Sequence, residues 1–369
     1  MKSPYRNIDT PALLIDREIM LDNLRWMQEK ADRWGVKLRP HTKTHKMPAL
    51  AKLQLQTGAA GITVAKVGEA EVMADHGITD IFIANEIVGE TKWRRLAALT
   101  AKANVMFGVD SPEAVRGIEQ VFAETGATAL VRIEVETGEN RSGVVSEAAF
   151  DAVLDAIAQC PHVTLEGVFS HEGHSYSAAS VEVCLQLLEE AQKLTLHYAD
   201  RAREKGFAVE SVSIGSTPSL AHSGSLLPGI TEVRPGTYIL MDVGQGNCIG
   251  TYDRCAATVL TTIISKPTED RLIGDAGAKA LTAQSRGAGL CQTDGKGMVK
   301  GSNVSVTNVY DEHTILYDRR LHETLSVGDK IEIIPNHICP VCNLYDEAYL
   351  VSQGEIVEIL PIAARGKLQ

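Results

Sequence analysis

The sequence has few aromatic residues and little positive charge. Aromatic side chains make up 5% of the 369 residues, and 36 Lys and Arg against 47 Asp and Glu leave a formal net charge of -11. No stretch is rich in Lys and Arg, so the chain lacks the positive surface that binds nucleic-acid phosphates or anionic membranes. We therefore expect no nucleic acid and no membrane among its partners.

Long hydrophobic runs and a cysteine framework are also missing. No apolar run reaches the length that spans a bilayer, and the N-terminal stretch MKSPYRNIDTPALLID contains no apolar signal core. The seven cysteines are odd in number and scattered, which argues against a disulfide framework. These features predict a cytoplasmic protein, in which only Cys339 and Cys342 lie close together in sequence.

The residues that are abundant indicate an α/β enzyme. Hydrophobic residues make up 44% of the chain and glycine occurs 31 times, as in α/β enzymes with many short connections. Such a chain is long enough for a large barrel and a second module. Segments with apolar residues every three or four positions alternate with β-rich runs, which cover residues 36–41, 61–67, 80–85, 104–110, 127–136, 163–171, 209–216 and 230–236. Eight such units predict a parallel (β/α)8 TIM barrel over residues 17–250.

The pattern changes after about residue 250. Runs separated by turns, with almost no helical period, cover residues 257–265, 271–277, 303–310, 329–335, 348–353 and 355–361. They predict a C-terminal antiparallel β domain over residues 251–369. The run PALLID at 11–16 precedes a helix and is a ninth strand, so residues 1–16 are expected to join the β domain.

The stretch LRPHTKTHK at 38–46 concentrates positive, titratable side chains at the end of the first barrel strand. Strand ends lie at the C-terminal mouth of a barrel, where barrel enzymes place their chemistry. Strand alternation would put Arg39, His41, Lys43 and His45 on one face and Lys46 on the other. A lysine partly buried among cations has its ammonium form disfavoured, as a Schiff-base lysine requires. Lys43 is the predicted pocket amine, and a solvated basic loop is the alternative.

Two glycine-containing turns follow the last two barrel strands. Gly215-Ser216-Thr217-Pro218 offers backbone N–H groups, two hydroxyls and a helix start, and Arg234-Pro235-Gly236-Thr237 adds a second glycine for close approach. Each turn alone is a weak signal, because glycines after strands usually only turn the chain. Together they occupy the place where barrels often hold phosphate. With a lysine at the first strand, this arrangement predicts a barrel that binds pyridoxal 5'-phosphate (PLP).

The sequence resembles the D-threonine aldolase and D-serine dehydratase family, whose members are relatives of alanine racemase. The matching motifs span nearly the whole chain: RPHTKTHK at 39–46, ITVAKVGEAEVMADHGI at 62–78, TGENRSGV at 137–144, SHEGHSY at 170–176, SIGSTPS at 213–219, EVRPGTY at 232–238, DAGAK at 275–279 and PNHICPVCNLYD at 335–346. The resemblance implies an alanine racemase-type barrel with a C-terminal β domain, and a homodimer.

The resemblance also assigns roles to individual residues. It implies that Lys43 bonds covalently to PLP, that Arg234 faces the pyridine nitrogen and that Arg141 lies close to the phenolic oxygen. Tyr176 matches a residue stacked on or bonded to the cofactor, and His171 is a further catalytic candidate at the mouth. The phosphate-binding positions match Gly215, Ser216, Thr217, Gly236 and Thr237.

The motif PNHICPVC is a candidate metal site. His337 and Cys339 are two residues apart, so on an extended segment their side chains would project to the same side and chelate one ion. A His nitrogen and a Cys thiolate suit zinc, with manganese as the alternative, and two protein ligands leave positions open for water or substrate. Taken alone, this pair is more often a buried cysteine beside a turn histidine. The resemblance implies a two-ligand metal site here.

The second metal ligand bears on the reaction. The resemblance implies His-x-Asp in aldolases and His-x-Cys in dehydratases, so His337-Ile338-Cys339 favours a dehydratase that converts a D-3-hydroxy amino acid to a 2-oxo acid and ammonia. D-Serine, D-threonine and 3-hydroxy-D-aspartate are the candidate substrates. An aldolase that yields glycine and an aldehyde would use the same site, and an amino-acid racemase would need no metal.

Overall fold

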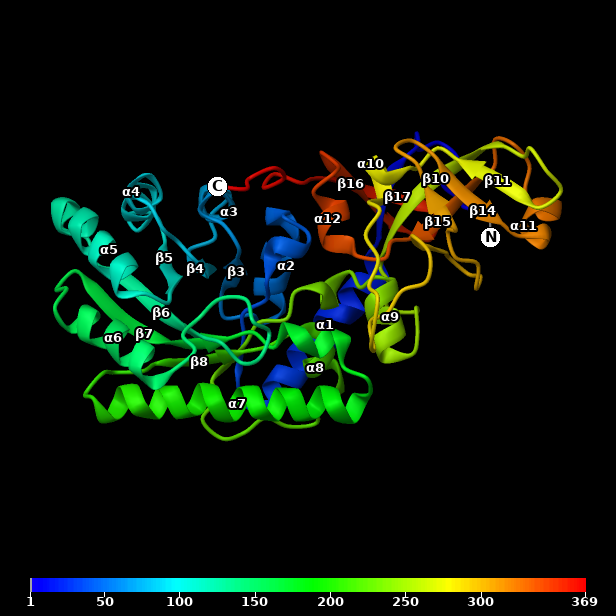
Figure 1. The fold of residues 1–369 in the computed structure, drawn as a ribbon. Helices are drawn as coiled ribbons and strands as arrows, with labels where there is room; N and C mark the ends of the chain where they lie inside the picture. Colours follow the sequence, from blue (N-terminus) through cyan, green and yellow to red (C-terminus); the bar gives the residue numbers. More distant parts are fainter. Residues whose placement is uncertain (1) are drawn as a thin grey trace.

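The computed structural model describes residues 2–369 and contains a barrel and a β domain (Figure 1). The barrel strands are β2 (Lys37–Leu38), β3 (Ile62–Val64), β4 (Asp80–Glu86), β5 (Asn104–Val109), β6 (Ala129–Val135), β7 (Val163–Ser170), β8 (Ser211–Ile214) and β9 (Glu232–Val233). They pair in parallel in the order β2-β9-β8-β7-β6-β5-β4-β3. A bridge between His41 and Thr63 joins the two ends of this order. The predicted parallel TIM-type barrel is confirmed.

Helices follow the strands, as the apolar period predicts. Their bounds are α1 (Arg17–Trp34), α2 (Pro48–Thr57), α3 (Val67–Asp75), α4 (Glu90–Leu99), α5 (Pro112–Thr125), α6 (Glu147–Ala158), α7 (Val181–Glu204), α8 (Thr217–His222) and α9 (Val243–Ile249). In α1, the Asp16 carboxylate caps the first turn by accepting from Ile19 N at 3.0 Å. Gly35, at φ +68°, ends this helix in the left-handed conformation that glycine adopts most readily.

The second sheet takes its strands from both ends of the chain. They are β1 (Ala12–Asp16), β10 (Ala257–Ser265), β11 (Arg271–Gly274), β12 (Met298–Val299), β13 (Asn308–Val309), β14 (Thr314–Tyr317), β15 (Lys330–Ile334), β16 (Glu347–Ser352) and β17 (Glu355–Pro361). As expected, β1 belongs here: it pairs with β10 antiparallel and with β16 in parallel. The sheet is therefore mostly antiparallel, and the exact domain boundaries stay a prediction.

Two expectations for the β domain are wrong in detail. The strand expected over 303–310 shrinks to β13, and short helices interrupt the sheet: α10 (Ala278–Leu281), α11 (Arg319–Thr324) and α12 (Ile338–Cys342). These helices have four to six residues, too few for a helical period to show in sequence. The chain then returns to the barrel, where Gly68 N donates to Gln369 O at 2.8 Å. Within residues 2–369, no helix is long and apolar enough to cross a membrane.

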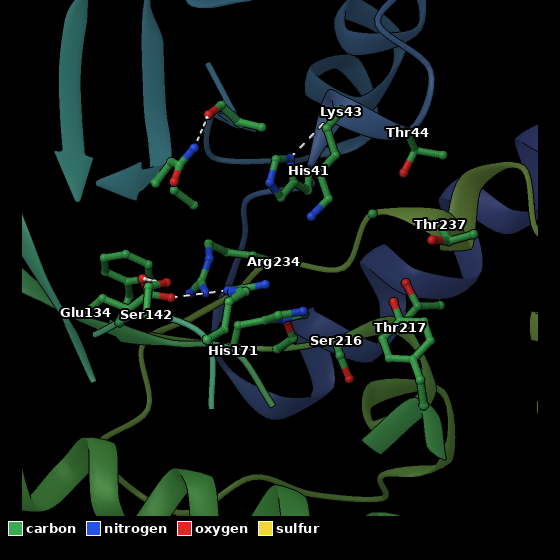
Figure 2. Close-up of a pocket in the computed structure, with 18 of the residues that line it drawn as sticks. His41, Lys43, Thr44, Glu134, Ser142, His171, Ser216, Thr217, Arg234 and Thr237 are labelled. Atoms are coloured by element: carbon green, nitrogen blue, oxygen red, sulfur yellow. Dashed lines mark hydrogen bonds and ion pairs between the residues drawn. The ribbon is translucent and has the colours of Figure 1, made fainter. Parts of the chain in front are cut away.

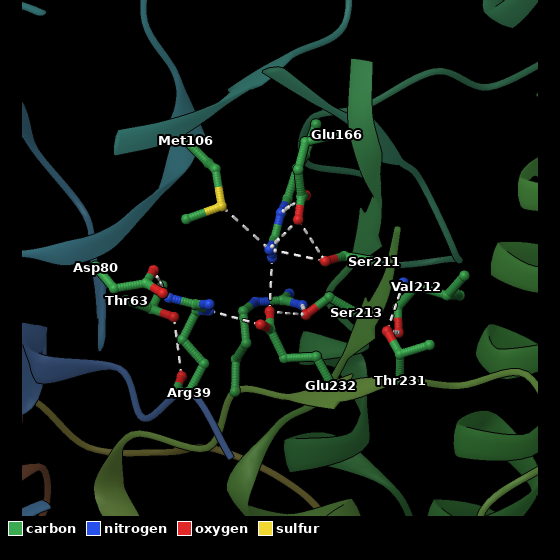
Figure 3. A network of polar contacts seen from close by, with 12 residues as sticks. Arg39, Thr63, Asp80, Met106, Glu166, Ser211, Val212, Ser213, Thr231 and Glu232 are labelled. Atoms are coloured by element: carbon green, nitrogen blue, oxygen red, sulfur yellow. Dashed lines mark hydrogen bonds and ion pairs between the residues drawn. The ribbon is translucent and has the colours of Figure 1, made fainter. Parts of the chain in front are cut away.

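A network of charged side chains fills part of the barrel interior (Figure 3). Glu232 accepts from Arg39 Nε through Oε2 and from Arg132 NH1 through Oε1, both at 2.6 Å. Arg132 also pairs with Glu166, and Arg39 with Asp80. Burial alone would raise the pKa of Glu232, but the two arginines outweigh it and hold the pKa well below the usual range. The interior is thus held by paired, hydrogen-bonded charges.

Candidate active site

A cavity of about 410 Å³ opens at the carboxyl ends of the barrel strands. All nine predicted cofactor-binding residues line it, together with His171, although the structure does not test their roles. Figure 2 shows Lys43 reaching in from one side toward His171 and Arg234. Thr217 and Thr237 lie at one end of the cavity, and Glu134 and Ser142 lie at the other.

Lys43 reaches the cavity for a different reason from the predicted one. Strand β2 ends at Leu38, and Lys43 lies in a 3-10 turn, Thr42–Thr44, so strand alternation does not extend over this segment. Arg39 points into the barrel network, and His45 is buried beside Gln54, with Nε2 and Oε1 3.2 Å apart. The expected common face of four basic residues is therefore wrong. Only His41 and Lys43 among them line the cavity.

The surroundings of Lys43 favour its neutral amine. Burial is the largest cause that lowers the pKa of Lys43, and the positive charge of Arg141 adds to it. The neighbouring Cys339 acts in the opposite direction. A neutral amine is both a nucleophile and a base, which a protonated lysine is not.

The turns after β8 and β9 form a cradle that fits a phosphate group. Thr217 Oγ1 is buried and has no hydrogen-bond partner among the described residues. Gly236 packs so closely that an added Cβ would lie 3.1 Å from His41 O and Thr44 Oγ1. Gly215 adopts φ +127°, which an L side chain rarely tolerates. The orphan hydroxyl and the side-chain-free backbone suit the phosphate of PLP.

Arg234 is held rigidly in the middle of the cavity floor. Its NH1 donates to Ser213 Oγ and its NH2 to Ser170 O, both at 2.6 Å. Ser213 Oγ in turn donates to Glu232 Oε1 at 2.6 Å, which ties Arg234 to the barrel network. Burial lowers the pKa of Arg234 to about 10, against the charge of Glu232, so the guanidinium stays charged at neutral pH. A fixed cation here fits the predicted partner of a pyridine nitrogen.

His171 and Tyr176 both face the cavity. His171 Nδ1 is 3.0 Å from Gly215 O, and because a carbonyl oxygen only accepts, Nδ1 carries the proton. Burial lowers the pKa of His171 well below its usual value, and the positive charge of Arg141 acts in the same direction, which leaves Nε2 as a free base. Burial raises the pKa of Tyr176, and the Arg286 guanidinium lies 4.7 Å from its ring centre.

Several wall residues were not predicted, including Asn85, Glu86, Glu134 and Ser142. Two of them left a signal in the sequence. Glu86 ends the strand DIFIANE, and Glu134 interrupts the apolar strand ALVRIEV. An acidic residue in a buried strand is uncommon unless it is paired, so both glutamates were detectable as candidates.

The metal pair is placed differently from the expectation. His337 is the N-cap of α12 and Cys339 lies in its first turn, so the expected extended segment is wrong. Cys339 Sγ nevertheless reaches the cavity rim, where it is 3.3 Å from Thr44 Oγ1. Burial lowers the pKa of His337 to about 4 and raises the pKa of Cys339, and the negative charge of Asp242 acts to raise both.

The donor set fits an ion with open coordination positions. No group of three or more His, Cys, Asp or Glu among residues 2–369 is arranged to hold a metal. An ion held by His337 and Cys339 would therefore complete its shell with water or substrate, as a catalytic zinc does. The Asp242 carboxylate accepts from Ile338 N at 3.1 Å and so fixes the backbone between the two residues.

Comparison with known proteins identifies the family. Residues 15–243 match the alanine racemase N-terminal domain, and residues 256–351 match a putative serine dehydratase domain. The chain belongs to the alanine racemase-like family. Its place in that family is the group of D-threonine aldolases, D-serine dehydratases and hydroxyaspartate dehydratases, so it is a lyase of a PLP-dependent type.

Relatives of this lyase carry out two reactions. It is 32% identical to D-threonine aldolase from Arthrobacter sp., over 98% of this chain and 94% of the relative. It is also 32% identical to D-threo-3-hydroxyaspartate dehydratase from Delftia sp. strain HT23, over 92% and 93%. The structure of D-threonine aldolase from Filomicrobium marinum aligns with a TM-score of 0.89 at 31% identity, over 99% and 98%.

Two solved structures are of D-threo-3-hydroxyaspartate dehydratase variants. One replaces a histidine by alanine and the other a cysteine two residues later, and the cysteine variant is in a metal-free form. Sequence identity does not separate aldolase from dehydratase, since the chain is 32% identical to a relative of each kind. What these relatives share is action on D-3-hydroxy amino acids, and the chain is a lyase of that substrate class.

Proposed function

We propose that this lyase is a PLP- and metal-dependent dehydratase that converts a D-3-hydroxy amino acid to a 2-oxo acid and ammonia. The observation that carries the proposal is the Cys339 thiol, which lies two residues after His337 in the chain and 3.3 Å from Thr44 of the cavity wall. The His-x-Cys spacing equals that of the two residues replaced in the D-threo-3-hydroxyaspartate dehydratase variants. PLP would be held by Lys43, Arg234 and the cradle, and supplies an electron sink for charge at the substrate's Cα.

The chain's own residues divide the proton chemistry. Lys43, whose pKa is lowered by burial, would accept the proton from the substrate's Cα. His171, with Nε2 unprotonated, is the second base on the wall and would orient the substrate. The ion at His337 and Cys339 would supply Lewis-acid chemistry for the β-hydroxyl, the leaving group in a dehydratase.

Substrate carboxylates need a cation, and Arg286 fits that task. Its Nε is buried without a hydrogen-bond partner among residues 2–369, and its guanidinium stacks on Tyr176 at the cavity. We expect Arg286→Gln to raise KM about 10- to 100-fold, the effect of one lost hydrogen bond to a charged group. Steady-state kinetics measures this, with Arg286→Lys as the charge-preserving control. An unchanged KM in Arg286→Gln would exclude the contact.

Chelation and product analysis test the reaction. D-Threonine is added to three samples: the untreated protein, the protein treated with EDTA, and the EDTA-treated protein after addition of zinc or manganese. We expect 2-oxobutanoate and ammonia that disappear on chelation and return with metal. Glycine and acetaldehyde would instead identify an aldolase, the candidate favoured by the Arthrobacter and Filomicrobium relatives. Metal-independent formation of L-threonine or L-allothreonine would identify a racemase. The homodimer and the cytoplasmic location stay predictions.

A further inference from the structure

Two carboxyl groups meet on the cavity wall at the end away from the phosphate cradle. Glu86 ends β4 and Glu134 lies in β6, on either side of β5, and both line the cavity. Glu86 is within hydrogen-bonding reach of Glu134. One oxygen of Glu86, Oε1, is buried without a partner among the described residues. Neither group has a part in the proposed reaction.

An irregularity in β4 turns Glu86 toward the cavity. The register of β4 against β5 shifts between Ile83, which pairs with Phe107, and Glu86, which pairs with Gly108. Gly108 allows this crossing, because an added Cβ would lie 2.7 Å from Asn85 O. Strand irregularities of this kind re-aim a side chain next to a site. The position of Glu86 is therefore built into the barrel.

Glu134 accepts hydrogen bonds from two neighbouring side chains. Its Oε2 accepts from Ser142 Oγ at 2.8 Å, and its Oε1 accepts from Arg141 NH2 at 3.3 Å. Both oxygens of Glu134 thus act as acceptors toward the loop that carries Arg141 and Ser142. The Arg141 side chain is half exposed, and its NH1 lies 3.3 Å from Glu139 Oε2. Its NH2 is held by Glu134 on the buried side.

Two adjacent carboxyls in a buried wall cannot both be ionised without strong repulsion. We propose that Glu86 holds a proton and donates it to Glu134, and that this carboxyl pair is the positioning device that aims Arg141 into the cavity. The pair then carries one negative charge, which matches the single positive charge of Arg141. Ionisation of Glu86 would put two like charges side by side and release Arg141 and Ser142.

The electrostatics agree with this geometry. Burial is the largest cause that raises the pKa of Glu86 to about 9, followed by the hydrogen bond to Glu134 and its charge. Asp110, which follows β5, adds a further negative charge on the same side. With a pKa of about 9, Glu86 keeps its proton at neutral pH and is half ionised near pH 9.

Infrared spectroscopy of the purified full-length protein tests the proton directly. In the difference spectrum of wild type minus Glu86→Gln, we expect the C=O band of a protonated carboxyl at pH 7. The band should disappear on titration to higher pH, with a midpoint near pH 9. Glu134→Gln removes the neighbouring charge, so the Glu86 band should then disappear at lower pH. Absence of the band from wild type at pH 7 would show that Glu86 is ionised and would overturn the proposal. The wild-type and Glu134→Gln titrations decide the question even where Glu86→Gln fails to fold.

Cofactor affinity tests the effect on Arg141. We expect the affinity of the wild type for PLP to weaken above pH 9 by up to tenfold per pH unit relative to Glu86→Gln, whose neutral amide cannot ionise. If Glu86 had only a structural role, Glu86→Gln would bind PLP more weakly than wild type by the same factor at every pH. Parallel pH profiles of PLP affinity for the two proteins would therefore overturn the positioning role. This arm rests on the proposed function, because it assumes PLP. The infrared arm does not, so the two can fail separately.

Discussion

Replacing Lys43 with alanine should abolish turnover and leave the fold intact. Lys43 lies in the cavity wall, where burial lowers its pKa, and the proposed reaction uses it both to hold PLP and to accept a proton. We expect the rate of 2-oxo acid formation to fall by roughly 10⁴-fold, the upper end of what one positioned acid–base group contributes. The measurement is product formation with excess PLP.

Two controls separate chemistry from folding in this experiment. Lys52→Ala removes an exposed lysine from α2 and should leave the rate unchanged. Added methylamine, a small amine that enters the vacated space, should restore part of the activity of Lys43→Ala. Retention of more than about one hundredth of the wild-type rate by Lys43→Ala would contradict an acid–base role for this residue.

Replacing Glu232 with alanine should cause the largest loss of stability. Glu232 pairs with Arg39 and Arg132 in the barrel interior, where all three are buried. Its removal leaves two buried guanidinium groups without this partner, so we expect the free energy of unfolding to fall by about 3–5 kcal/mol. Urea denaturation followed by circular dichroism measures this loss.

A surface pair provides the matched control. Glu124→Ala breaks the pair between Glu124 and Arg94, whose side chains are 59% and 49% exposed. This change should cost less than about 1 kcal/mol, because exposed ion pairs contribute little. An equal loss of unfolding free energy in Glu232→Ala and Glu124→Ala would contradict the proposed contribution of the interior network to stability.

The stability of wild type and of Glu232→Ala should depend differently on pH. The pKa of Glu232 is held below the usual range in the folded state, so its contribution is fully present above the usual glutamate pKa. It is lost as the pH falls toward the depressed value. Wild type should therefore lose stability more steeply in acid than Glu232→Ala, and the difference between the two should shrink.

Local sequence pattern was sufficient for the architecture. The eight strands and the helices between them were predictable because apolar residues repeat with the periods of the two structures. Pattern failed over short segments: residues 42–44 form a 3-10 turn and residues 338–342 a helix, each too short for a period to show. Strand alternation assumed there led to the wrong faces for Arg39 and His45 and the wrong backbone for His337 and Cys339.

The sequence by itself determined the fold class and most of the cavity wall. Residues that end parallel strands must meet at one mouth, so Lys43, Ser216 and Arg234 come together in any barrel built from these segments. Only the tertiary structure decided the pairings. Three contacts join elements far apart in the chain: Cys339 with Thr44, Glu86 with Glu134, and Glu232 with its two arginines. Such contacts depend on how whole elements pack, which no local pattern records.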